Sequence, residues 1–108
     1  MANTFKLKTK ANVGVTTTAV YVAPGSTTTV VIGITASNIS GNNINVGIGI
    51  TRAAADDIHL MKNVPIPQGS SFEFMQGNII VLETTDTITA KSDVNNSLDV
   101  ALTIMEIT

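Results

Sequence analysis

The chain has 108 residues, the length of one small domain. Charged residues make up 13% of it, against a usual share of about 25%, and hydrophobic residues make up 44%. A net charge of -2 and an isoelectric point near 5.0 argue against nucleic acid as a partner, because that binding depends on clustered Lys and Arg. The absence of cysteine excludes a disulfide and a thiolate zinc site. We expect no signal peptide and no membrane span, since no apolar run approaches about 20 residues.

The low charge also says something about the surface. It has to be covered mainly by Thr, Asn, Ser and Gly, which are frequent in the chain. A neighbouring protein can cover such a surface at low cost, since few ions must lose their water. The composition therefore favours a protein that works in an assembly.

The N-terminal run FKLKTK alternates lysine with other residues. In an extended strand it has one basic face, with Lys6, Lys8 and Lys10, and one mainly apolar face. Two hypotheses fit: an edge strand whose lysines prevent uncontrolled pairing, or an arm that adds to the sheet of a neighbouring subunit. We therefore divide the chain into an N-terminal basic arm or edge strand, residues 1–10, and a β-sandwich domain, residues 11–108.

Alternation with a period of two residues, typical of half-buried strands, dominates the next part of the chain. It predicts strands over 15–22, 28–37 and 44–51, with a β-bulge near 16–18 where the apolar parity shifts. The turns APGS and SGNN separate these strands. The residues predicted to face the core are Val30, Ile32, Ile34 and Ala36 in the second strand, and Ile44, Val46, Ile48 and Ile50 in the third.

The segment from Gly47 to His59 supplies most of the remaining candidate contact residues. Gly47 and Gly49 lie on the outward face of their strand, where a partner can approach closely, although steric relief inside the sheet explains them equally well. The run RAAADD at 52–57 has no strand period, and its alanines could form one helical turn. In the predicted strand 57–63, Asp57, His59 and Met61 are expected opposite Ile58 and Leu60. The predicted partner interface comprises Lys6, Lys8, Lys10, Gly47, Gly49, Arg52, Asp56, Asp57 and His59.

The C-terminal part predicts strands over 71–75, 78–83 and 86–91, with a further strand at 97–107. Phe72 and Phe74 are expected in the core. The last strand is expected to bury Leu98, Val100, Leu102 and Ile104. Short strands separated by tight turns predict an all-β fold: a single-domain antiparallel β-sandwich of about eight strands, of jelly-roll or Ig-like type.

The sequence offers little for catalysis. His59 is the only histidine, and although Asp56 and Asp57 lie nearby, a metal centre needs three or four ligands at supporting spacing. There is no G-x-S-x-G motif around a candidate nucleophile, and GIGIT lacks the third glycine of a dinucleotide site. We expect no enzyme, no cofactor and no metal, and a His59 that faces solvent or an interface.

Two stretches, residues 20–51 and 59–107, carry a resemblance. They contain YVAPGS, KNVPIPQGSSFE, GNIIVLETTDTI and LDVALTIMEI. Together they resemble the small β-sandwich virion structural proteins of tailed bacteriophages, especially cyanophages. The lysine-rich start and the RAAADD loop depart from that pattern.

The resemblance implies a position on the outside of a capsid, as a decoration or cement protein, or on the neck, tail or fibres. Our leading hypothesis is a non-enzymatic virion protein that decorates the capsid. Its expected partners are the major capsid protein or other virion proteins, and copies of itself in a trimer or ring, with no nucleic acid and no membrane. Its expected location is the virion, assembled in the host cytoplasm. The alternatives are a tail, neck or fibre component and a host-surface binding module.

Overall fold

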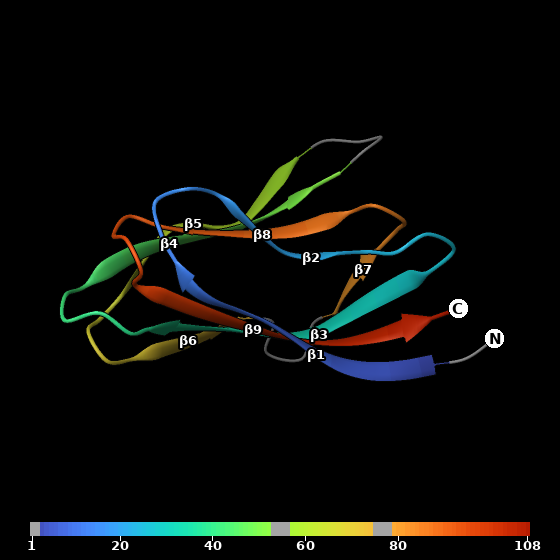
Figure 1. The fold of residues 1–108 in the computed structure, drawn as a ribbon, viewed down its shortest axis with the longest axis horizontal. Coiled ribbons are helices and arrows are strands. Elements are labelled where there is room, and N and C mark those ends of the chain that lie inside the picture. Colours follow the sequence, from blue (N-terminus) through green and yellow to red (C-terminus); the bar gives the residue numbers. More distant parts are fainter. Residues whose placement is uncertain (1–2, 53–56, 75–78) are drawn as a thin grey trace.

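The computed structural model describes residues 3–52, 57–74 and 79–108. These residues form β-strands in two antiparallel sheets that lie one above the other, and the first strand begins at the same end of the molecule at which the last strand ends (Figure 1). The strands are β1 (Asn3–Val13), β2 (Thr18–Val22), β3 (Thr28–Asn38), β4 (Ile44–Thr51), β5 (Ile58–Ile66), β6 (Ser71–Phe74), β7 (Ile80–Leu82), β8 (Thr87–Ser92) and β9 (Leu98–Ile107). No described segment forms a helix with the length and hydropathy that a membrane span needs.

The connectivity is that of a jelly roll. Sheet A has the order β1-β9-β3-β6, with β7 also paired to β3, and sheet B has the order β2-β8-β4-β5. β6 and β7 pair with different parts of β3, so they form two pieces of one sheet edge. When these two pieces count as one strand, each sheet has four strands and most connections cross from one sheet to the other, as in a jelly roll. The predicted antiparallel sandwich is confirmed, in its jelly-roll form.

The core lies between the two sheets and follows the alternation in β4 and β9. Every residue predicted to face inward from these two strands is buried, as are Met61, Ile66, Leu82 and Ile88 from neighbouring strands. In both strands the alternation of apolar and other residues continues without a shift from the first residue predicted inward to the last. A single assignment of inward and outward positions therefore holds for the whole strand.

In β3 the predicted inward face was wrong in the first half. Thr29 and Val31 are buried, whereas Ile32 is exposed. The pairing with β9 shifts register between Val31 and Gly33, which is the mark of a β-bulge. The extra residue reverses the side-chain parity, so that only Ile34 and Ala36, beyond the bulge, face the core as predicted.

A second parity error lies in β5. Met61 is buried and Ile58 is exposed, the reverse of a simple alternation, because the pairing with β4 shifts register twice between Val46 and Gly49. Phe72, predicted in the core, is also exposed. The side chain of Phe74 and the predicted helical turn within 52–57 lie outside the described residues.

The predicted strand 15–22 begins too early. Residues 14–17 connect β1 to β2, and the register shift in this region lies between Ala19 and Tyr21 in the pairing of β2 with β8, not at 16–18. β1 is longer than predicted and continues past Lys10 to Val13.

Candidate functional site

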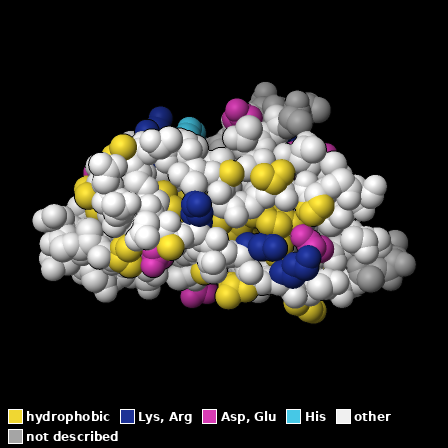
Figure 2. Space-filling model, in the orientation of Figure 1, with side chains coloured by type: hydrophobic (Ala, Val, Ile, Leu, Met, Phe, Trp, Pro, Cys, Tyr) yellow, Lys and Arg dark blue, Asp and Glu magenta, His cyan; other side chains and the backbone are white. Residues whose placement is uncertain are grey.

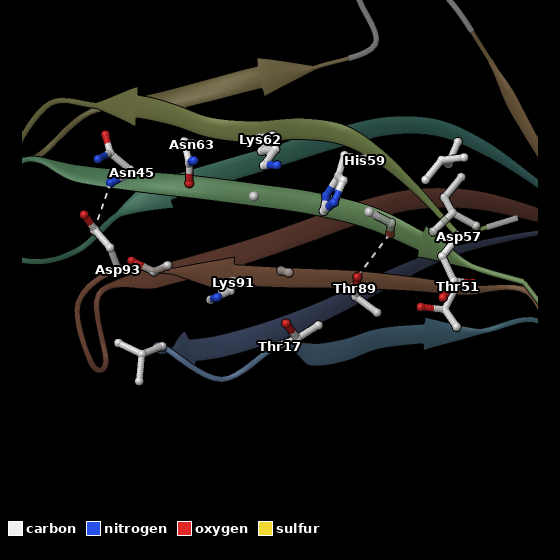
Figure 3. Close-up of a pocket in the computed structure, with 17 residues that line it drawn as sticks. Thr17, Asn45, Thr51, Asp57, His59, Lys62, Asn63, Thr89, Lys91 and Asp93 are labelled. Carbon is white, nitrogen blue, oxygen red and sulfur yellow. Dashed lines mark hydrogen bonds between the residues drawn. The ribbon is translucent and has the colours of Figure 1, made fainter.

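A groove of about 620 Å³ runs along the outer face of sheet B (Figure 3). Its floor is the stretch of β4 that contains Gly47 and Gly49, and its sides come from β5 and β8. A Cβ atom at Gly49 would lie 2.8 Å from the carbonyl oxygen of Ile58, whereas one at Gly47 would lie 3.5 Å from that of Met61. Steric relief against β5 therefore accounts for Gly49, and the missing side chains leave the floor of the groove open.

The charged side chains of the groove differ in how they are held. At one end Asp93 Oδ1 accepts a hydrogen bond from the backbone N–H of Asn45, at 3.0 Å (Figure 3). At the other end Asp57 Oδ1 accepts one from the backbone N–H of Arg52, also at 3.0 Å. Lys62 and Lys91 line the two sides, and no salt bridge among the described residues involves them. The groove therefore presents two unpaired ammonium groups, while its carboxylates cap backbone N–H groups at the ends.

Four of the predicted interface residues, Gly47, Gly49, Asp57 and His59, come together in this groove. Asp56 lies outside the described residues. Within the described part of the chain, no three His, Cys, Asp or Glu residues come close enough to hold a metal ion. Whether a partner contacts the groove stays a prediction.

Arg52 is held by its own chain. Its Nε lies 3.2 Å from Asp86 Oδ2 and its terminal nitrogen lies 3.1 Å from Glu83 Oε2. Asp86 is buried, and the same Oδ2 also accepts the backbone N–H of Glu83 at 3.0 Å. Arg52 thus ties the end of β4 to the turn that leads into β8, and its charge is already balanced inside the subunit.

β1 is an edge strand of sheet A, paired with β9 from Asn3 opposite Ile107 to Lys10 opposite Val100. The lysines lie on its inner side: Lys6 is opposite Ile104 and Lys8 is opposite Leu102, both buried in the core. Figure 2 shows Lys or Arg side chains gathered over β1 with an acidic side chain beside them. Lys6, Lys8 and Lys10, which we predicted to contact a partner, therefore lie on the side of β1 that faces the opposite sheet, at the open edge of the sandwich.

Lys6 closes this rim through a buried polar cluster. Its Nζ lies 2.7 Å from Glu106 Oε1, and Glu106 Oε2 accepts a hydrogen bond of 2.6 Å from the hydroxyl of Tyr21. The same hydroxyl lies 2.8 Å from Thr29 Oγ1. Hydrogen bonds from Lys6 and Tyr21 lower the pKa of Glu106, while burial, helped by the Glu106 hydrogen bond, raises the pKa of Tyr21 to about 12. The cluster joins β1, β9 and β3 of sheet A to β2 of sheet B.

The other side of β1 is apolar and faces outward. Phe5 is 69% exposed and Leu7 is 66% exposed. Phe5 lies opposite Met105, Met105 opposite Val30, and Val30 opposite Val81, which is 54% exposed. We call these four residues the apolar row; it crosses the outer face of sheet A from β1 to β7.

Sequence reasoning missed the apolar row. The alternation in β1 separates a basic side from an apolar side, and by itself it does not tell which side faces the core. One signal was available: Glu106 has the same parity as the buried residues of the last strand, and a buried carboxylate needs a cation. That requirement favours placing the lysines inward and the aromatic side chain outward.

No protein family model matches the chain, and no curated protein matches it. Among solved structures, a chain from the work described as "Bacillus endospore appendages form a novel family of disulfide-linked pili" is similar, with a TM-score of 0.60 and 13% identity. The match covers 99% of this chain and 87% of the other. At this identity the likeness concerns the fold alone. These 108 residues contain no cysteine, so they cannot make the disulfide links named for that protein. The comparisons support the small all-β sandwich and contain no evidence for a phage family.

Proposed function

We propose that this chain is a non-enzymatic structural subunit that is repeated in a larger protein assembly. The observation that carries the proposal is the apolar row with Leu7 beside it: Phe5, a member of the row, and Leu7 are each about two-thirds exposed. Exposed apolar patches of this kind are typical of surfaces that bind other proteins. The likeness to a pilus protein supports the same class of role at the level of fold.

The position that we propose first is the outside of a tailed-phage capsid, as a decoration protein. The stretches KNVPIPQGSSFE and LDVALTIMEI, which resemble phage virion proteins, support it. The major capsid protein is then the partner and the virion the location. A tail, neck or fibre position is the next choice within the same class.

A filament subunit is the second candidate, and the fold likeness to the Bacillus appendage protein favours it. Because this chain lacks cysteine, its subunits would have to be held by contacts other than disulfides. Such a filament should come apart in denaturant without a reducing agent.

Cryo-electron microscopy of purified particles, with mass spectrometry of their proteins, tests the proposal. A jelly-roll density of this size repeated on the shell lattice supports decoration, and density confined to the tail or neck supports the second position. Repetition along an extracellular fibre supports the filament. A chain that is expressed but absent from every such assembly would overturn the structural role.

A further inference from the structure

The apolar end of sheet A carries the apolar row together with Leu7, Ile32 and Ile107, all of them uncharged, and the exposed Glu83, two residues after Val81, is paired with Arg52. Leu7 lies opposite Thr103, and Thr103 opposite Gly33 at the β3 bulge. The acids of this outer face, Asp99 and Glu73, belong to the other end of the sheet, opposite Ser37 and Thr35. Two copies of the apolar end can therefore meet without placing like charges against each other.

The edge of the sheet at β1 is less suited to a contact than its face. Inward-pointing charged side chains on an edge strand are a recognised means of preventing edge-to-edge pairing. Lys6 and Lys8 have this placement, and Lys6 is held there by Glu106. A strand added beside β1 would bring its own side chains against these ammonium groups, whereas a sheet stacked on the outer face would meet Phe5 and Leu7.

The area of the outer face of sheet A determines how strong a contact through it can be. β1 and β3 have 11 residues each, which at about 3.4 Å per residue gives strands about 37 Å long, and four strands about 4.8 Å apart span roughly 19 Å. The whole face then measures roughly 700 Å², near the ~800 Å² that each partner buries in a standard interface. The apolar end is about half of it, so a contact through this end alone should be weak and reversible, and should gain strength from repetition in an assembly.

We propose that the partner of this surface is a second copy of the chain, stacked face to face through the apolar end of sheet A about a two-fold axis. The inference rests on the proposed structural role and names the surface that it uses. In a two-fold contact the same patch serves both copies, so it must be self-complementary. An uncharged apolar patch meets that requirement directly, whereas two copies of the groove of sheet B would have to bring Lys62 and Lys91 of one copy against Asp57 and Asp93 of the other.

The test is a concentration series of the purified chain, followed by sedimentation velocity and by amide chemical shifts, up to about 1 mM, where contacts worth only about 4 kcal/mol are seen. We expect a monomer–dimer equilibrium whose concentration-dependent shifts gather on the outer face of β1, β9, β3 and β7. Phe5→Ser combined with Leu7→Ser should raise the dissociation constant by about tenfold or more, as truncation of a central anchor does. Val22→Ser is the matched control, since Val22 is 52% exposed on β2 of the other sheet.

Circular dichroism melting of each variant separates lost association from lost folding, and Val81→Ser, on a different strand, repeats the test if the β1 variant is unstable. A chain that stays monomeric over the whole series, or whose shifts gather on the groove or on β2, would overturn the face-to-face dimer. A monomer that is nonetheless found in particles removes the dimer and leaves the structural role. A chain that dimerises through this face but is absent from all assemblies would remove the structural role and leave the dimer.

Discussion

Tyr21→Phe is the sharpest single test of how the sandwich is closed. The change removes one oxygen atom from a side chain that is only 6% exposed and leaves the ring in place, so no cavity beyond that atom is created. The lost hydroxyl donates to Glu106 at 2.6 Å and lies 2.8 Å from the hydroxyl of Thr29. Glu106 keeps Lys6, whereas the buried Thr29 hydroxyl is left with no other side-chain partner among the described residues.

The expected cost follows from these two contacts. A hydrogen bond to a charged group contributes about 1.5–3 kcal/mol, and one between neutral groups about 0.5–1.5 kcal/mol. Because Lys6 still neutralises Glu106, we take the lower part of the sum and expect a loss of about 2–3 kcal/mol in the free energy of unfolding. For a domain of this size, each kcal/mol lowers Tm by about 4–8 °C, so a fall of about 8–24 °C is expected.

The assay is thermal and urea unfolding followed by circular dichroism. Thr89→Val is the control: it also removes a hydroxyl, whose hydrogen bond to Gly49 O is long, at 3.3 Å, and on the outer face, so its effect should stay below about 0.5 kcal/mol. A Tyr21→Phe variant within about 0.5 kcal/mol of the wild type would refute the reasoning. In a double-mutant cycle with Glu106→Gln, the two changes should be clearly non-additive.

The same cluster predicts two pH dependences of opposite sign. Since the folded pKa of Tyr21 is raised from 10.0 to about 12, its stabilisation is complete below pH 10 and is lost as the pH rises through this interval. Tyr21 is the only tyrosine, so the tyrosinate absorbance of the folded chain reports it alone. The pKa of Glu106 is lowered from 4.5, so its stabilisation is present above that pH and is lost as the pH falls below it. Titration of native Tyr21 near 10 would contradict the buried hydroxyl.

Three further variants probe the groove and its turns, each measured by urea unfolding. Gly49→Ala should destabilise the fold by about 1–3 kcal/mol, because its Cβ would lie 2.8 Å from a backbone oxygen of β5, whereas Gly47→Ala, at 3.5 Å, should be nearly neutral; equal effects would contradict the packing described. Arg52→Ala should cost about 1–2 kcal/mol, since the buried Asp86 carboxylate loses its cation, and a neutral result would mean that solvent replaces the guanidinium. Thr85→Gly should stabilise the fold by up to about 1 kcal/mol, since Thr85 holds a φ of 70° that a β-branched residue rarely adopts; a loss of stability would show that no strain is stored there.

The sequence was sufficient for the fold class because most strands carry one unbroken parity. β4 and β9 bury every residue predicted inward. β3 could not be assigned in this way: Val30, Val31 and Ile32 are apolar in both phases, so the bulge that turns Ile32 outward leaves no trace in the hydrophobic pattern. Bulges are set by pairing with the neighbouring strand, and that information lies elsewhere in the chain.

Of the two candidate surfaces, the groove could be predicted in part from local alternation, whereas the apolar row could not. Gly47, Gly49, Asp57 and His59 were predicted on outward positions of neighbouring strands, and the structure gathers them in one groove. The outward position of Phe5 and Leu7 was missed because it depends on which side of β1 faces the core. That choice is made by the contact between Lys6 and Glu106, which lie a hundred positions apart in the chain. Local alternation carries no information about such a pair.

The two surfaces lie on opposite sides of the molecule, because the outer faces of a two-layer sandwich point away from each other. Pairing of two copies through the apolar end of sheet A would therefore leave both grooves facing outward and unoccupied. The groove differs from that face in its charge, since Lys62 and Lys91 line it and its two carboxylates are held by backbone N–H groups. A partner that presents acidic groups to Lys62 and Lys91 would fit the groove better than it would fit the apolar row. If copies of the chain pair through the apolar end of sheet A and another protein binds the groove of sheet B, the two contacts use separate surfaces. A substitution on one surface should then abolish one contact and leave the other intact.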